Sequence, residues 1–82
     1  MADAMTSDDP RDKLQAAVNH DWWDQRQDLP PGYVAECSTW YEALTQPQRA
    51  LATAARLAFE DGKEEEALKI AASLPAAPKC PL

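Results

Sequence analysis

The chain has 82 residues and a net charge of −6, with 14 acidic and 8 basic side chains. A chain of this length forms one domain at most, and the absence of a basic stripe argues against direct nucleic-acid binding. No apolar run approaches the roughly 18 residues of a membrane span, and the first residues lack an apolar leader. We therefore expect a cytoplasmic protein that does not contact a membrane.

The first helix is predicted over 9–27, after a flexible N-terminal tail at 1–8. Asp9 is a suitable N-cap and Pro10 fits the first helical position. The helix should end before Leu29, because a residue that precedes proline disfavours the α conformation. Its apolar face is formed by Leu14, Ala17, Val18 and Trp22.

A second helix is predicted over 31–44, after the stiff turn "LPPG". Its core stripe follows helical spacing, and the two aromatic residues Tyr33 and Trp40 flank it. The stripe consists of Val34, Cys37, Tyr41 and Leu44.

The third helix is predicted over 46–61, where Thr45 and Gln48 have the spacing of a capping box. The segment "RALATAARLAF" is apolar on most sides, which is typical of a helix at the centre of its domain. Its many alanines would allow neighbouring helices to approach closely. The remaining polar stripe consists of Arg49, Thr53, Arg56 and Glu60.

The fourth helix is predicted over 63–74, after Gly62 ends the third in the C′ position. Glu65 and Lys69 are spaced for an ion pair on its surface. The inward residues are expected to be Ala67, Ile70, Ala71 and Leu74.

Together these elements predict an all-α fold, a compact bundle of about four short helices in a single domain at 9–74. Only two glycines and almost no β-branched runs support this class. The short connections favour antiparallel neighbours. A flexible Pro/Ala-rich tail is expected at 75–82.

The segment "ALATAARLAFEDGKEEEALKIAASL", under a third of the chain, resembles a single tetratricopeptide-type helical hairpin. Gly62 stands at its turn and Ala67 follows the acidic run. The segment lacks a second copy and the aromatic residues of the family's first helix. We interpret the resemblance as a shared helical hairpin, and it implies no binding residues.

No residue pattern predicts catalysis, a metal site or a cofactor. His20 and Asp24 are four residues apart, but zinc normally needs three or four ligands, so His20 is interpreted as a solvated side chain. Cys37 lies on a core stripe and is interpreted as a small buried hydrophobe rather than a nucleophile. A disulfide between Cys37 and Cys80 is possible by count only. We therefore predict that the protein is not an enzyme.

Two groups of residues are candidate partner contacts. Trp23 points about 100° away from the core residue Trp22, over the small or polar face of Ala16 and Asn19. It either anchors a partner or folds under the turn at Pro30 and Tyr33. The candidate partner-binding residues are Trp23 with the acids Asp21, Asp24 and Asp28, and the acidic run Glu64, Glu65 and Glu66.

These features predict a small acidic regulator, adaptor or inhibitor that binds another protein with a basic surface and occludes it. Its oligomeric state stays open. One alternative is a nucleic-acid mimic that occupies the groove of a DNA- or RNA-binding protein, because the acidic run could imitate phosphates. Another alternative is an accessory subunit of an enzyme complex.

Overall fold

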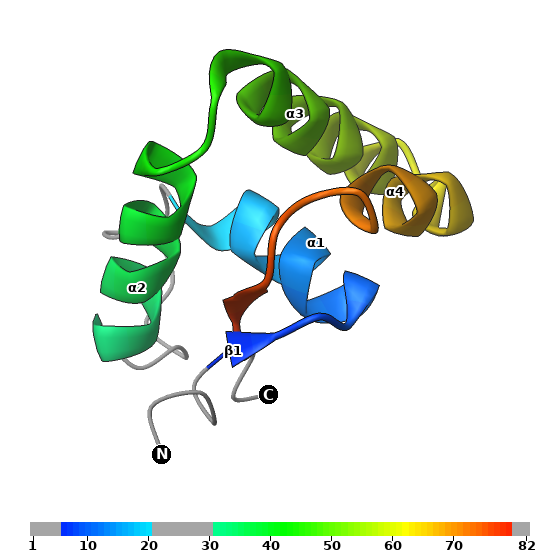
Figure 1. The fold of residues 1–82 in the computed structure, drawn as a ribbon. Helices are drawn as coiled ribbons and strands as arrows, with labels where there is room; N and C mark the ends of the chain where they lie inside the picture. Colours follow the sequence, from blue (N-terminus) through cyan, green and yellow to red (C-terminus); the bar gives the residue numbers. More distant parts are fainter. Residues whose placement is uncertain (1–5, 21–30, 80–82) are drawn as a thin grey trace.

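The computed structural model describes residues 6–20 and 31–79, and it confirms the all-α bundle (Figure 1). Four helices carry the fold, and one short pair of strands joins the two ends of the described chain. The elements are β1 (Thr6–Ser7), α1 (Pro10–Asn19), α2 (Pro31–Glu42), α3 (Gln46–Glu60), α4 (Glu64–Ala71) and β2 (Ala77–Pro78).

Helix α1 begins as its sequence predicts. The Asp9 side chain accepts a hydrogen bond from the backbone N–H of Arg11 at 2.9 Å, and Pro10 occupies the first turn. Leu14 and Val18 are buried on the expected face. The helix runs to Asn19, and residues 21–27 of the expected helix lie outside the described residues.

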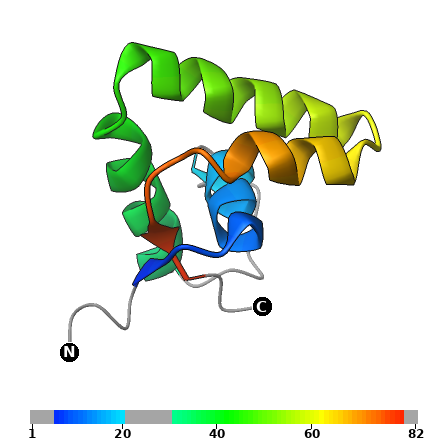
Figure 2. The ribbon, with the colours of Figure 1, turned by 45° about the vertical axis from the view of Figure 1, so that its right-hand side comes forward.

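The centre of the domain is α1, not α3. Helix α1 contacts α2, α3, α4 and β2, and both ribbon views place it between α2 and the α3–α4 pair (Figure 2). Helix α3 lies at the edge, where Leu51 is 38 % and Leu57 is 59 % exposed. The prediction that α3 is central was therefore wrong, because only one of its apolar faces is covered.

The α3–α4 pair is an antiparallel hairpin built on small residues. The fully or nearly fully buried residues of these two helices are alanines, which lets the two backbones approach closely. This outcome confirms the role expected for the alanines of the third helix. The alanines concerned are Ala52, Ala55 and Ala58 on α3, and Ala67 and Ala71 on α4.

The α2–α3 connection makes a corner instead of an antiparallel pair. Thr45 and Gln48 form the predicted capping box. The Thr45 N–H donates to Gln48 Oε1 at 2.9 Å, and the Gln48 N–H donates to Thr45 Oγ1 at 3.3 Å. From this cap α3 runs away from α2, and the two helices contact each other little (Figures 1 and 2). Arg49 holds the corner by donating from Nη2 to the carbonyl of Glu42 at 2.8 Å. A short connection therefore did not make these two helices antiparallel neighbours.

The buried face of α2 is turned slightly from the predicted stripe. Trp40 is only 9 % exposed, whereas Tyr41 is half-buried. Trp40 is drawn inward because its Nε1 donates to the carbonyl of Pro75 at 3.3 Å. The buried residues of α2 and of the turn that follows it are Tyr33, Val34, Cys37, Trp40 and Leu44.

The packed unit extends beyond the expected limits of 9 and 74. Thr6 pairs with Pro78 and Ser7 with Ala77 in a two-residue antiparallel ladder, and Ala77 is fully buried. Residues 6–8 and 75–79 of the expected tails are therefore part of the domain. Residues 1–5 and 80–82 lie outside the described residues.

Candidate functional site

The acidic run predicted as a contact surface lies in the first turn of α4. Glu64, Glu65 and Glu66 are all exposed there, where carboxylates interact favourably with the helix dipole. The other predicted contact residues, Asp21, Trp23, Asp24 and Asp28, lie outside the described residues and stay predictions.

The turn before α4 brings further acids to the same end of the molecule. Gly62 has φ +83°, which ends α3 in the predicted left-handed C′ conformation. The Lys63 N–H donates to the carbonyl of Ala58 at 2.9 Å and the Gly62 N–H to that of Phe59 at 3.1 Å, which is the Schellman pattern. The chain therefore reverses within three residues and places Glu60 and Asp61 near the start of α4.

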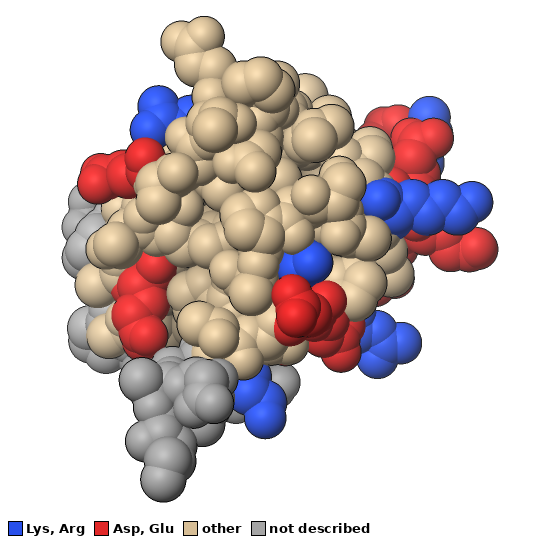
Figure 3. All heavy atoms as spheres, viewed as in Figure 1, with Lys and Arg blue, Asp and Glu red and all other residues tan. Residues whose placement is uncertain are grey.

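Basic side chains are interspersed among these acids. Arg56 Nε lies 3.2 Å from Glu60 Oε2, and Lys63 Nζ lies 3.6 Å from Asp61 Oδ2. Figure 3 shows acidic and basic side chains together at the end of the molecule where α3 meets α4. The charge of this end is therefore mixed instead of uniformly negative.

The predicted surface pair of α4 does not form. Within the described part of the chain, Lys69 makes no ion pair with Glu65, and both side chains are exposed. Such a pair would stabilise the helix by only about 0.2–0.5 kcal/mol, so its loss leaves α4 intact.

An open groove of about 630 Å³ lies beside the mixed charges, between α3 and α4. Its apolar wall includes Leu57, which is 59 % exposed, and Ile70, which was expected to face the core but is half-buried. Of the predicted acidic run, only Glu66 lines it. The full lining is Ala54, Leu57, Ala58, Glu60, Asp61, Lys63, Glu66 and Ile70.

A second hollow of about 360 Å³ lies between α2 and β2. Trp40 lines it together with Ala35, Thr39 and Pro78. The indole N–H of Trp40 is already bonded to Pro75, so this hollow gains no hydrogen-bond donor from the ring.

The single histidine is not a solvated side chain as expected. The His20 ring stacks on Tyr41 of α2, with 3.8 Å between centroids and 4° between planes, and it is half-buried. The guanidinium of Arg49 lies 5.6 Å from the centre of the same Tyr41 ring. The three side chains come from the C-cap of α1, from α2 and from α3, so the cluster joins these helices at the corner.

The face of α1 assigned to Trp23 is also more buried than expected. Ala16 and Asn19 were interpreted as a small or polar surface, but both are fully buried. The Asn19 amide donates to Gln15 Oε1 at 3.3 Å. The reason is the central position of α1, which is covered on more than one side.

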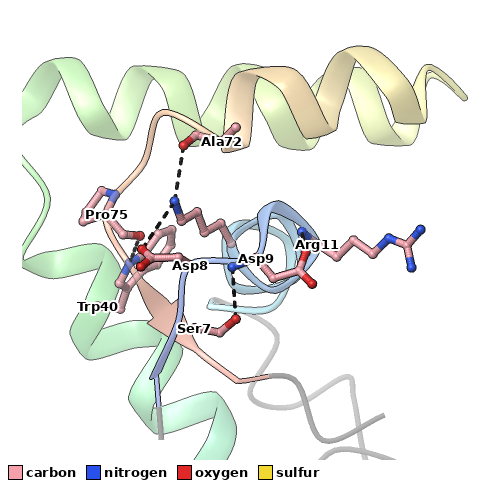
Figure 4. A network of polar contacts seen from close by, with 8 residues as sticks. Ser7, Asp8, Asp9, Arg11, Trp40, Ala72 and Pro75 are labelled. Atoms are coloured by element: carbon pink, nitrogen blue, oxygen red, sulfur yellow. Dashed lines mark hydrogen bonds and ion pairs between the residues drawn. The ribbon is translucent and has the colours of Figure 1, made fainter. Parts of the chain in front are cut away.

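A buried lysine joins three segments of the fold. Lys13 is 5 % exposed, and its Nζ donates to the carbonyl of Ala72 at 3.2 Å, at the C-terminal end of α4. Asp8 Oδ1 lies 3.9 Å from the same Nζ (Figure 4). The ammonium group therefore sits where the helix dipole favours a positive charge.

The side chain of Cys37 is fully buried, which confirms its interpretation as a small buried hydrophobe. Within 6–20 and 31–79, no three His, Cys, Asp or Glu side chains are grouped to hold a metal ion. Over the same residues, no helix has both the length and the apolar character required to cross a bilayer.

Three groove residues, Ala54, Leu57 and Ile70, were not predicted as a site. The sequence signal that could have indicated them is that α3 carries more apolar residues around its circumference than one covered face requires. No family model, curated protein or solved structure matches the chain. The functional argument therefore depends on the geometry of this groove.

Proposed function

We propose that the protein is a small, non-enzymatic cytoplasmic regulator that binds another protein and occludes part of its surface. The contact surface is the groove between α3 and α4, with its mixed but mainly acidic edge. The observation that carries this proposal is the exposure of Leu57, at 59 %, inside a groove lined by other apolar side chains.

The position of Leu57 distinguishes it from an ordinary surface leucine. Single exposed hydrophobic residues are common, but an apolar hollow with a polar edge is typical of a contact surface. Covering a leucine side chain contributes about 1.5–3 kcal/mol in full, so covering the exposed 59 % of Leu57 would favour binding by about 1–2 kcal/mol. A domain of 82 residues has few large apolar side chains to leave uncovered.

The same geometry disfavours the nucleic-acid mimic. A mimic needs a continuous row of negative charges, whereas Arg56 and Lys63 are paired with acids at this end. An accessory subunit would use the same groove on a larger, permanent partner. The predicted contact through Trp23, with Asp21, Asp24 and Asp28, would add a second point of attachment.

The test is affinity capture from the source organism with the wild type and two matched variants, followed by binding measurements with each purified partner. Leu57→Gln removes the apolar side chain without adding charge. Leu51→Gln makes the same change at 38 % exposure on the same helix, outside the groove. We expect Leu57→Gln to weaken binding about tenfold, a loss of about 1.4 kcal/mol, and Leu51→Gln to leave it within twofold.

The proposal fails if no captured partner depends on Leu57 while both variants keep the stability of the wild type. A Trp23→Ala variant examined in parallel tests the predicted second contact. Capture of a stoichiometric enzyme complex would identify the accessory-subunit alternative, and competition between nucleic acid and the protein for one partner would identify the mimic.

A further inference from the structure

We infer that the groove binds a single amphipathic helix of the partner, one that carries lysine or arginine beside its apolar face. This inference rests on the proposed function and specifies the chemistry of the partner. It combines the shape of the groove with the charges at its edge.

The shape fits a helix. The groove follows two antiparallel helices, and its apolar wall comes from Ala54, Leu57 and Ile70. Amphipathic helices bind in such grooves through apolar residues spaced by three or four positions, because these lie on one face. The groove is open to solvent and has a volume of about 630 Å³, which suits a helix that lies on the surface and inserts a few apolar side chains.

The edge of the groove selects basic residues. Three acids, Glu60, Asp61 and Glu66, line it against one base, Lys63, and Glu60 is also paired with Arg56 outside the lining. The Lys63–Asp61 ion pair is exposed, at 62 and 71 % of the two side chains, so it contributes little and can exchange for a pair with the partner. Glu66 makes no ion pair within the described residues and is available to a cation.

The same charges disfavour a second copy of this chain as the occupant. Each copy carries a net charge of −6, so two copies repel each other, whereas a basic helix is attracted. The partner helix is therefore expected to come from a different protein.

The experiment uses the whole chain and three labelled model peptides of about 18 residues, long enough for five turns of helix. The first has leucines at helical spacing on one face and lysines beside them. The second has glutamates in place of the lysines. The third has the composition of the first, with the leucines distributed around the helix. Fluorescence anisotropy measures the affinity of each peptide.

We expect only the first peptide to bind, with a dissociation constant in the micromolar range. Leu57→Gln should weaken its binding about tenfold and Leu51→Gln less than twofold. Glu66→Lys should weaken it about threefold or more, and added salt should weaken it further. Amide chemical shifts should change at Ala54, Leu57 and Ile70 when the peptide is added.

Equal binding of the first and third peptides would overturn the inference, because it would indicate charge attraction without a groove. Unchanged binding by Leu57→Gln would overturn it too, as would a dimer of the chain that Leu57→Gln dissociates. If native partners depend on Leu57 but the first peptide does not bind, the inference that the partner supplies a basic amphipathic helix is wrong, and the proposed function stands. If no native partner depends on Leu57, the proposed function itself fails.

Discussion

Replacing Lys13 by methionine tests whether a buried charge holds α1, α4 and the β1 segment together. Methionine retains most of the apolar stem, which matters because Lys13 is only 5 % exposed. It removes the hydrogen bond of 3.2 Å from Nζ to the carbonyl of Ala72. A hydrogen bond with one charged group contributes about 1.5–3 kcal/mol.

The net loss is smaller than that value for two reasons. Ala72 is exposed, so water can replace the lysine at its carbonyl, and the substitution also removes the cost of burying an ammonium group. We therefore expect Lys13→Met to lower the free energy of unfolding by about 1 kcal/mol. Lys13→Ala also removes about three buried methylene groups and should cost about 2–3 kcal/mol more.

Urea unfolding followed by circular dichroism gives these free energies directly. For a domain of this size, 1 kcal/mol corresponds to about 4–8 °C in Tm. Asp8→Asn is the control, because Asp8 is 89 % exposed at 3.9 Å from Nζ and its pairing contributes little. If Lys13→Met is as stable as the wild type or more stable, the ammonium group does not hold these segments together and the reasoning is refuted.

Two further predictions concern the turn and the C-terminal segment. Gly62→Ala should lower the free energy of unfolding by about 1 kcal/mol, because alanine disfavours the φ of +83° at this position. Gly32→Ala, inside α2 with open space around it, should be neutral or stabilising in the same thermal unfolding experiment, and equal effects of the two variants would contradict the prediction. Trp40→Phe should cost about 1 kcal/mol by removing the hydrogen bond to Pro75, and should speed amide hydrogen exchange near Ala77; unchanged exchange would show that Trp40 does not hold the segment.

Three helix caps were predictable because their signals are local, whereas the second and fourth helices end at Glu42 and Ala71 instead of the predicted 44 and 74. Asp9 with Pro10, Thr45 with Gln48, and Gly62 each act on backbone groups within five residues, and all three predictions were confirmed. The direction of α3 was not predictable in this way. It depends on the corner at Arg49, where side chains from the C-cap of α1, from α2 and from α3 meet.

The candidate site was only partly predictable. The acids near the turn are visible in the sequence, because the residues from Glu60 to Glu66 are close along the chain. The groove beside them requires Leu57 and Ile70 on two different helices. Ile70 was expected to face the core, and the third helix was expected to be central, so no exposed groove was predicted there. Helical periodicity identifies apolar faces but does not state which face another element will cover.

The sequence by itself determined the class of the fold, three helix caps and the presence of several acids near the α3–α4 turn, since each depends on composition or on neighbours along the chain. Only the tertiary structure decided which apolar residues stay exposed. Helix α3 buries Ala52, Ala55 and Ala58 where it packs against α4 and α1, because small side chains allow a close approach of helices. That choice leaves Leu57 uncovered and creates the groove on which the proposed function depends.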